Sequence, residues 1–162
     1  MSSEKKTETD IKITKLSWSQ LGNIVMVIAK DVSEKFDPDV VVGIGRSGLI
    51  PASILVKKLG TSEFYTIIMS LYSEGKPPHR LGKEPRVLFD NVGPLTGKNV
   101  LVVDDFARTG DTIKKVIKRI FESEAKEVKS AVVGLRQDAS YKPDFVGTKF
   151  EGCLIFPWDS AQ

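Results

Sequence analysis

The feature that most constrains this fold is a short apolar run followed at once by two carboxylates. Residues 100–103 are four aliphatic residues in succession, and Asp104 and Asp105 come next. A run without polar alternation predicts a strand buried on both faces, which is typical of the interior of a parallel sheet. Parallel strands need helical crossovers, so this run favours an α/β fold. The carboxylates are expected where the strand leaves the sheet, at the edge where open α/β sheets bind ligands.

Apolar runs and helical patterns alternate along the rest of the chain. Further strands are predicted at residues 40–44, 64–71, 86–90, 128–135 and 153–156. A first helix is predicted after Ser17, which forms a capping-box pattern with Gln20, and a second over residues 49–59, closed by Gly60. A third helix has one apolar face, made of Ile113, Val116, Ile117, Ile120 and Phe121. This order predicts a mainly parallel sheet flanked by helices.

The composition narrows the classes of partner. Apolar residues make up 41% and charged residues 28% of the 162 residues, which predicts one domain over residues 11–162 after a disordered tail over residues 1–10. A formal net charge of +3 is too small to favour nucleic acid. No apolar run reaches the length of a membrane span, and a single cysteine fits a reducing compartment. We therefore expect a cytosolic protein with neither a nucleic-acid nor a membrane partner.

The segment between the acidic pair and the third helix has the character of an anion-binding turn. It consists of Ala107, Arg108, Thr109, Gly110, Asp111 and Thr112. Backbone N–H groups at a helix start point outward, the helix dipole favours an anion there, and threonine hydroxyls add donors. The segment therefore predicts a phosphate site. Asp104 and Asp105 would repel that phosphate, so they suit sugar hydroxyls or a magnesium ion carried by the same ligand.

A second turn is expected at the same edge of the sheet. Gly45, Arg46, Ser47 and Gly48 follow the strand predicted over residues 40–44, and a parallel sheet places them beside the acidic pair. The glycines let the backbone approach a ligand closely, and the guanidinium of Arg46 suits phosphate oxygens. The sequence thus predicts two neighbouring anion-binding turns.

The apolar strand, the acidic pair and the Thr-Gly-x-Thr turn resemble the signature of the type I phosphoribosyltransferases. The resemblance implies that Asp104 and Asp105 lie against the ribose hydroxyls of phosphoribosyl pyrophosphate, with Asp105 the better candidate for binding magnesium. It also implies that residues 107–112 wrap the 5′-phosphate and that residues 45–48 hold the pyrophosphate. In the family this second turn contains a non-proline cis peptide, which in this chain is expected between Arg46 and Ser47.

The polar stretch over residues 72–85 resembles the mobile flap of the same family. The resemblance implies that Tyr72 takes part in catalysis, and that Arg80 and Lys83 lie over the pyrophosphate when the flap closes. Closure makes chemical sense, because the transfer passes through an oxocarbenium-like state that water would intercept. The family joins a serine directly to this tyrosine, whereas one residue separates the two in this chain.

The C-terminal run Phe156-Pro157-Trp158-Asp159 resembles the end of the short xanthine–guanine type of 6-oxopurine phosphoribosyltransferases. The resemblance implies a small hood and a base site formed by Arg136, Leu154, Phe156 and Arg108. Arg136 falls where that group directs a lysine at the purine O6, and a cationic donor favours an oxo group over an amino group. Two positions depart from the pattern. Arg108 replaces an aspartate that faces purine N7, and Cys153 replaces a tryptophan that stacks on the purine.

The resemblance implies transfer of phosphoribosyl from phosphoribosyl pyrophosphate to a purine in purine salvage, with Mg²⁺ as the cofactor. The first choice of acceptor is a 6-oxopurine, namely hypoxanthine, guanine or xanthine. Adenine or another nucleobase stays an alternative, because an arginine at position 108 cannot accept the N7 proton. A regulator that senses phosphoribosyl pyrophosphate or nucleotides without turnover is the other alternative, although the Arg46 turn and the flap favour catalysis. The family usually forms dimers or tetramers, which implies a homo-oligomer.

Overall fold

Six strands form the central sheet in the order β4-β3-β2-β5-β6-β7. The computed structural model describes residues 12–70 and 82–159. The strands are β2 (Val40–Gly45), β3 (Glu63–Ser70), β4 (Arg86–Asp90), β5 (Asn99–Ala107), β6 (Glu127–Arg136) and β7 (Phe145–Phe150). Neighbouring strands are parallel except β3 and β4, which are antiparallel. The expected mainly parallel sheet is therefore confirmed.

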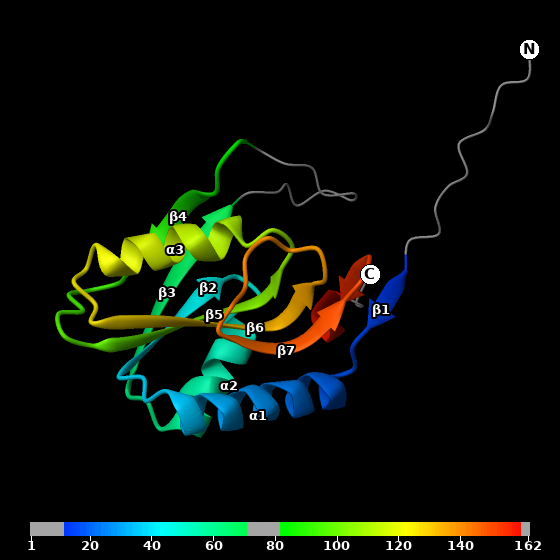
Figure 1. Cartoon of the computed structure of the whole chain (residues 1–162), viewed down its shortest axis with the longest axis horizontal. Helices are drawn as coiled ribbons and strands as arrows, with labels where there is room; N and C mark the ends of the chain where they lie inside the picture. Colours follow the sequence, from blue (N-terminus) through cyan, green and yellow to red (C-terminus); the bar gives the residue numbers. More distant parts are fainter. Residues whose placement is uncertain (1–11, 71–81, 160–162) are drawn as a thin grey trace, which may run out of the picture.

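Helices cover both faces of this sheet (Figure 1). Helices α1 (Trp18–Lys35) and α2 (Leu49–Leu59) pack on one face, and α3 (Asp111–Phe121) packs on the other. Each face has its own buried cluster of apolar side chains, one around Val25 and Leu55 and the other around Ile113 and Ile120. Strand β5 contributes to both clusters, which explains why residues 100–103 show no polar alternation.

The start of α1 and the end of α2 are defined by the local signals expected from the sequence. The hydroxyl of Ser17 accepts from the backbone N–H of Gln20, whose side chain accepts from the N–H of Ser17, so the capping box forms. Helix α2 ends at Gly60, which has a φ of +69°.

The prediction that Phe121 lies on the buried face of α3 is wrong, because this residue is 50% exposed. Phe121 is rotated by about 100° from the buried Ile120 and leaves the apolar stripe.

Two strands lack a sequence pattern that would predict them. Strand β7 is buried at both ends, but the four residues between carry no alternation. Its Gly147 lies against α1, where a Cβ would be 2.2 Å from Cγ2 of Ile24. The other strand is β1 (Ile13–Lys15), which pairs in parallel with β8 (Cys153–Ile155) from the opposite end of the sequence. Three residues are too few to show a period.

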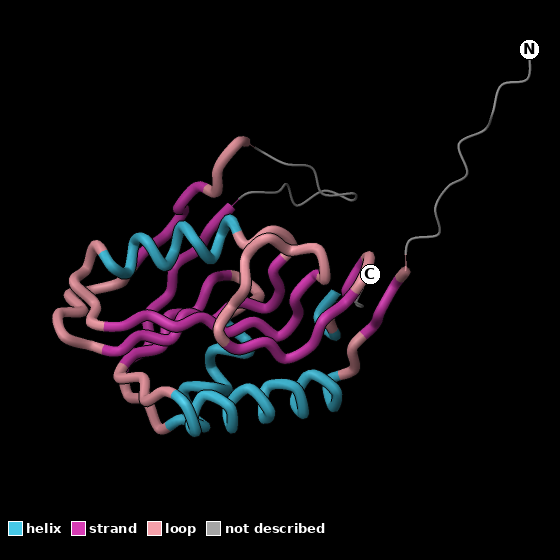
Figure 2. The backbone as a smooth tube through the Cα atoms, in the orientation of Figure 1, coloured by secondary structure: helices cyan, strands magenta, loops and turns pink. Residues whose placement is uncertain are grey.

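The paired strands β1 and β8 form a separate two-stranded sheet at one end of the molecule (Figure 2). This sheet and the short 3₁₀ helix η1 (Pro157–Asp159) together form the expected hood, and below the hood means these three elements. Strand β8 ends at Ile155, one residue earlier than predicted.

Some predictions fall outside the described residues. The tail over residues 1–10 and most of the flap segment, including Tyr72 and Arg80, lie in the undescribed ranges 1–11 and 71–81. They stay predictions. Within the described ranges, no helix combines the length and the apolar character that crossing a membrane requires.

Candidate active site

A cavity of about 470 Å³ opens where β2, β3 and β5 end. Its lining comes from residues 44–47 after β2, residues 68–70 at the end of β3, and residues 104–113, together with Leu88 of β4. Because the carboxyl ends of parallel strands meet at one edge of a sheet, the two turns predicted from the sequence border the same cavity. The contributions of β3 and Leu88 carry no motif and were not anticipated.

Asp104 and Asp105 lie within β5, so the expectation that they follow the strand is wrong. The strand continues because β6 runs beside it, with Asp104 paired to Val132 and Ala107 to Leu135. Both carboxyl side chains are only 8% exposed. The N–H of Asp105 donates to Oδ1 of Asp104 at 2.9 Å, and the N–H of Phe106 donates to Oδ1 of Asp105 at 2.8 Å. The backbone of the strand thus holds both carboxylates in place.

The alternation of side chains along β5 reverses at this acidic pair. Val103 belongs to the buried cluster under α1 and α2, and Phe106 packs against the same cluster although it lies three residues further on. Ala107 lies with Val102 in the cluster under α3. A regular strand would place residues 103 and 106 on opposite faces. The reversal lets both carboxylates border the cavity while Phe106 lies toward the hood.

Burial raises the pKa of both carboxyl groups. The pKa of Asp104 lies well above its usual range, first because the group is buried and second because Asp105 is close. Burial also raises the pKa of Asp105 to about 6, with a smaller contribution from the charge of Asp159 in the hood. Two buried carboxylates are costly to ionise side by side. A cation bound between them, or donors on a ligand, would remove that cost.

The acidic pair suits Mg²⁺ better than a metal ion whose ligands all come from the protein. Mg²⁺ is usually held by one or two carboxylates together with water and substrate phosphates. Asp104 and Asp105 supply two such carboxylates beside the turn over residues 107–112, which we call the phosphate-type turn. In the described part of the chain, no three His, Cys, Asp or Glu side chains are grouped to hold a metal ion. The donor set therefore suits an ion that the substrate brings with it.

The turn over residues 107–112 is supported by the segment that follows β6. Gly110 has a φ of +87°, and a Cβ on it would lie 2.2 Å from Cβ of Tyr141, so this position requires glycine. The hydroxyl of Ser140 donates to the carbonyl of Thr109 at 3.2 Å. The N–H of Asp111 donates to Oγ1 of Thr109 at 3.3 Å. The support by Ser140 and Tyr141 comes from far along the chain and left no sequence signal.

The second turn packs directly against the acidic pair. A Cβ on Gly48 would lie 2.3 Å from the carbonyl oxygen of Ile44 and 2.9 Å from Oδ1 of Asp104, so only glycine allows this approach. The cis peptide is the Gly45–Arg46 bond, one residue earlier than predicted, because β2 extends to Gly45 and the turn begins there. Arg46 and Ser47 border the cavity.

Other predicted site residues lie away from the lining of this cavity. Arg136 borders a second cavity, and its Nε donates to Oδ1 of Asp138. Leu154 and Phe156 are buried in the cluster under α1 and α2. Lys83 is described but does not line the main cavity. The roles inferred for these residues stay predictions.

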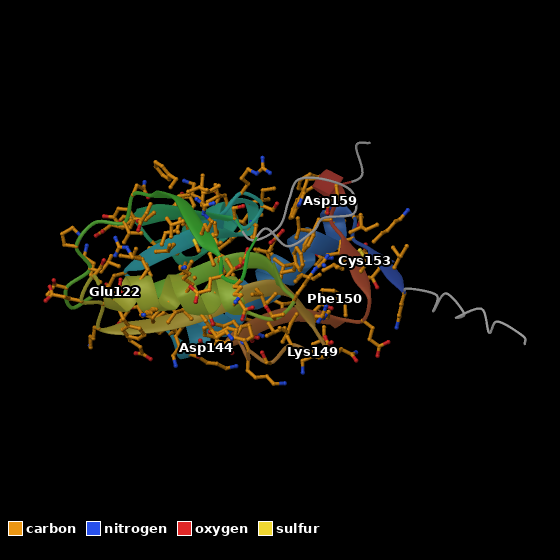
Figure 3. The ribbon with its side chains drawn as sticks, turned by 90° about the horizontal axis from the view of Figure 1, so that it is seen from above. Glu122, Asp144, Lys149, Phe150, Cys153 and Asp159 are labelled. Atoms are coloured by element: carbon orange, nitrogen blue, oxygen red, sulfur yellow. The ribbon has the colours of Figure 1, made fainter. Side chains whose placement is uncertain are left out.

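Phe106 is a site residue that the sequence interpretation missed. It lines the cavity, and its ring centroid lies 6.4 Å from that of Phe150 and 6.0 Å from that of Phe156. Trp158 stacks on Phe156 at 4.6 Å, and Trp18 lies 6.0 Å from Trp158. These five rings form an aromatic row from the cavity through the hood. Cys153 and Asp159 of the hood lie at the same end of the molecule as Phe150 in Figure 3. The sequence signal that could have identified Phe106 is its position between the acidic pair and the turn over residues 107–112.

Arg108 lies over the ring of Phe106. Its guanidinium carbon is 5.6 Å from the ring centroid, which is a cation–π distance, and Arg108 also lines the cavity. A permanent positive charge therefore stands on the Phe106 side of the phosphate-type turn.

Comparison with known proteins agrees with this geometry. Residues 17–160 match the family described as phosphoribosyl transferase domain. The chain is 25% identical over 159 residues to xanthine-guanine phosphoribosyltransferase of Gluconobacter oxydans, covering 96% of this chain and 90% of that protein. It is 33% identical over 118 residues to transcriptional regulator GfcR of Methanosarcina mazei, covering 70% of this chain and only 53% of the regulator. The structure of purine phosphoribosyltransferase from Pyrococcus horikoshii matches with a TM-score of 0.80 and 31% identity, covering 93% of this chain and 96% of that one.

Proposed function

Since this chain belongs to the phosphoribosyl transferase family, we propose that it transfers phosphoribosyl from phosphoribosyl pyrophosphate to a purine and releases pyrophosphate. One observation carries the proposal. A buried acidic pair, a phosphate-type turn at a helix start and a turn that contains Arg46 all border one cavity of about 470 Å³. A sugar that carries a phosphate at one end and a pyrophosphate at the other can use all three groups at once.

The sugar is held by groups on β5 and the turn that follows. The carboxylates of Asp104 and Asp105 accept hydrogen bonds from the ribose hydroxyls. The backbone of residues 107–112 donates to the 5′-phosphate at the positive end of α3. In this arrangement we expect the anomeric carbon between the acidic pair and the hood, with the base arriving from the hood side.

The leaving pyrophosphate faces the other turn. The guanidinium of Arg46 and the backbone of residues 45–48 donate to its oxygens. When bound by Asp105 and Asp104, Mg²⁺ would neutralise charge on the leaving group. Tyr72, Arg80 and Lys83 of the flap are proposed to cover this end during transfer, which would exclude water from the oxocarbenium-like state.

A 6-oxopurine is the acceptor we propose: hypoxanthine, guanine or xanthine. The support is the relative named xanthine-guanine phosphoribosyltransferase, which aligns over 96% of this chain. Adenine is the alternative acceptor, because Arg108 stays protonated and offers no group to take a proton from the base. Phosphoribosyl pyrophosphate and the nucleotide product carry phosphates and do not cross membranes unaided, so we place the reaction in the cytosol.

A regulator without turnover is the second candidate function. The similarity to transcriptional regulator GfcR favours it, at 33% identity over 70% of this chain. A nucleotide sensor needs a phosphate site and a ribose site, but it has no need of a pyrophosphate site. Arg46 at the cavity therefore favours the transferase over a sensor of nucleotide alone, whereas a sensor of phosphoribosyl pyrophosphate would also use it.

A pyrophosphate-release assay over a panel of bases decides among these candidates. The purified chain is incubated with phosphoribosyl pyrophosphate, Mg²⁺ and hypoxanthine, guanine, xanthine or adenine. Release with the oxopurines supports the proposed acceptor, and release with adenine alone replaces it. Binding of phosphoribosyl pyrophosphate without release for any base identifies a sensor. Sedimentation of the same sample tests the proposed dimer or tetramer.

A further inference from the structure

The position of Arg108 separates it from the other residues of the phosphate-type turn. Phe106, beneath its guanidinium, is the cavity residue that contacts the aromatic rings leading into the hood. The carbonyl of Thr109 and the backbone of Gly110 instead face the support from Ser140 and Tyr141. The guanidinium thus lies at the cavity on the Phe106 side of the turn, toward the aromatic rings that lead into the hood.

We propose that Arg108 reads the O6 and N7 edge of the purine by donating two parallel hydrogen bonds to it. This inference rests on the proposed function, because it assumes a purine between the acidic pair and the hood. A guanidinium offers donors in a fixed planar fork and no acceptor. In a 6-oxopurine, O6 and N7 are adjacent acceptors, and arginine binds this pair in the same two-pronged way in nucleic acids.

The same chemistry rejects adenine. Adenine presents an N7 acceptor beside an N6 amino donor, so one prong of the arginine fork would meet another donor. Phe106 supports the selection, since the cation–π contact holds the guanidinium over its ring. Arg108 would therefore favour a 6-oxopurine without any carboxylate at N7.

This readout also selects the form of the base. A donor directed at N7 needs N7 without a proton, so Arg108 binds the tautomer that carries its proton on N9, or the anion. The nucleotide product also lacks a proton at N7. Arg108 is thus expected to bind substrate and product through the same two atoms, so binding of the product alone can test the idea.

The test compares guanosine monophosphate with its 7-deaza analogue, in which a C–H group replaces N7. Calorimetry measures both nucleotides and ribose 5-phosphate on the wild-type chain and on Arg108→Met, Arg108→Lys and Lys58→Met. Wild type should bind guanosine monophosphate about tenfold more tightly than the analogue, as expected for one charge-assisted hydrogen bond. Lys58→Met removes an exposed charge from α2 and should match wild type.

Arg108→Met should lose this preference, weaken guanosine monophosphate by roughly 5- to 100-fold, and leave ribose 5-phosphate within about twofold of wild type. Arg108→Lys keeps a charged donor but loses the planar fork, so its preference should be smaller than that of wild type. A preference that survives in Arg108→Met overturns the proposal. An equal loss for ribose 5-phosphate also overturns it, because Arg108 would then bind the phosphate.

Failure of the transferase proposal would look different. It appears as an absence of pyrophosphate release by wild type with every base, whereas the readout by Arg108 is measured from nucleotide binding alone. Thermal unfolding of each variant identifies a folding defect, and Arg108→Lys keeps the test valid if Arg108→Met does not fold.

Discussion

The two ends of the cavity, the proposed sugar–phosphate end and the proposed base end, are built in different ways. The sugar–phosphate end comes from short continuous segments at the ends of β2 and β5, and close glycine contacts bind these segments to their neighbours: Gly48 lies against Asp104, and Gly110 lies against Tyr141. The base end depends on Phe106 and a hood whose two strands come from opposite ends of the sequence. The chemistry common to a family can reside in such compact motifs, whereas the choice of acceptor depends on packing between distant segments.

The largest effect is expected from removing both charges at the sugar–phosphate end. Asp104→Asn combined with Asp105→Asn should lower turnover by about 10³-fold or more, because each charged hydrogen bond contributes roughly 1.5–3 kcal/mol. Pyrophosphate release measures turnover, and circular dichroism measures the fold. Glu122→Gln, an exposed change at the opposite end of the molecule from the hood, is the matched control (Figure 3). Activity retained in the double variant would remove the basis of the assignment.

Arg46→Ala should divide the sugar–phosphate end into two subsites. We expect phosphoribosyl pyrophosphate to bind about 10- to 100-fold more weakly, as for the loss of one charged hydrogen bond. The nucleoside monophosphate should bind as before, because it carries no pyrophosphate. Calorimetry with both ligands measures the two affinities. Equal losses would show that Arg46 does not hold the pyrophosphate.

The buried acidic pair should make the metal-free protein less stable as the pH rises. The pKa of Asp105 is raised from 3.8 to about 6, so the folded state binds more protons than the unfolded state between these values. The free energy of unfolding should therefore fall as the pH rises from about 4 to 6, by up to about 3 kcal/mol. Urea unfolding of wild type and Asp105→Asn measures this change. Asp105→Asn should make the fall smaller, leaving the part that Asp104 causes, and should be the more stable protein at pH 7. An unchanged profile would show that the Asp105 carboxyl does not contribute to the pH dependence.

The smallest effect is expected at the base end. Trp158→Ala removes the stacking on Phe156, which contributes about 0.5–1.5 kcal/mol beyond buried area. The Michaelis constant for the base should rise a few-fold, while the affinity for phosphoribosyl pyrophosphate stays the same. Steady-state kinetics with each substrate varied in turn separate the two. If both constants changed equally, the two ends of the cavity would not be independent.

The same contrast explains how far the sequence could be interpreted. The buried strand, the acidic pair and both turns are contiguous patterns, so they predict the sheet and the neighbouring turns. Strand β1 is too short, at three residues, to show a pattern. Strand β7 shows no alternation and contains Gly147, whose close contact with α1 involves a segment far away in the sequence. The position of Phe106 depends on the reversal within β5, which a strict period of two cannot predict.

The pairing of β1 with β8 sets an order of events during synthesis. A growing chain carries residues 13–15 long before their partners at residues 153–155 are made. Pairing the two strands closes a long loop, which costs conformational entropy, and it can occur only after the strands of the central sheet have been synthesised. On the ribosome, the segments proposed to hold the sugar and its phosphates are therefore complete before the hood. On the proposed function, selectivity for the acceptor therefore arises only after the sugar–phosphate end is complete.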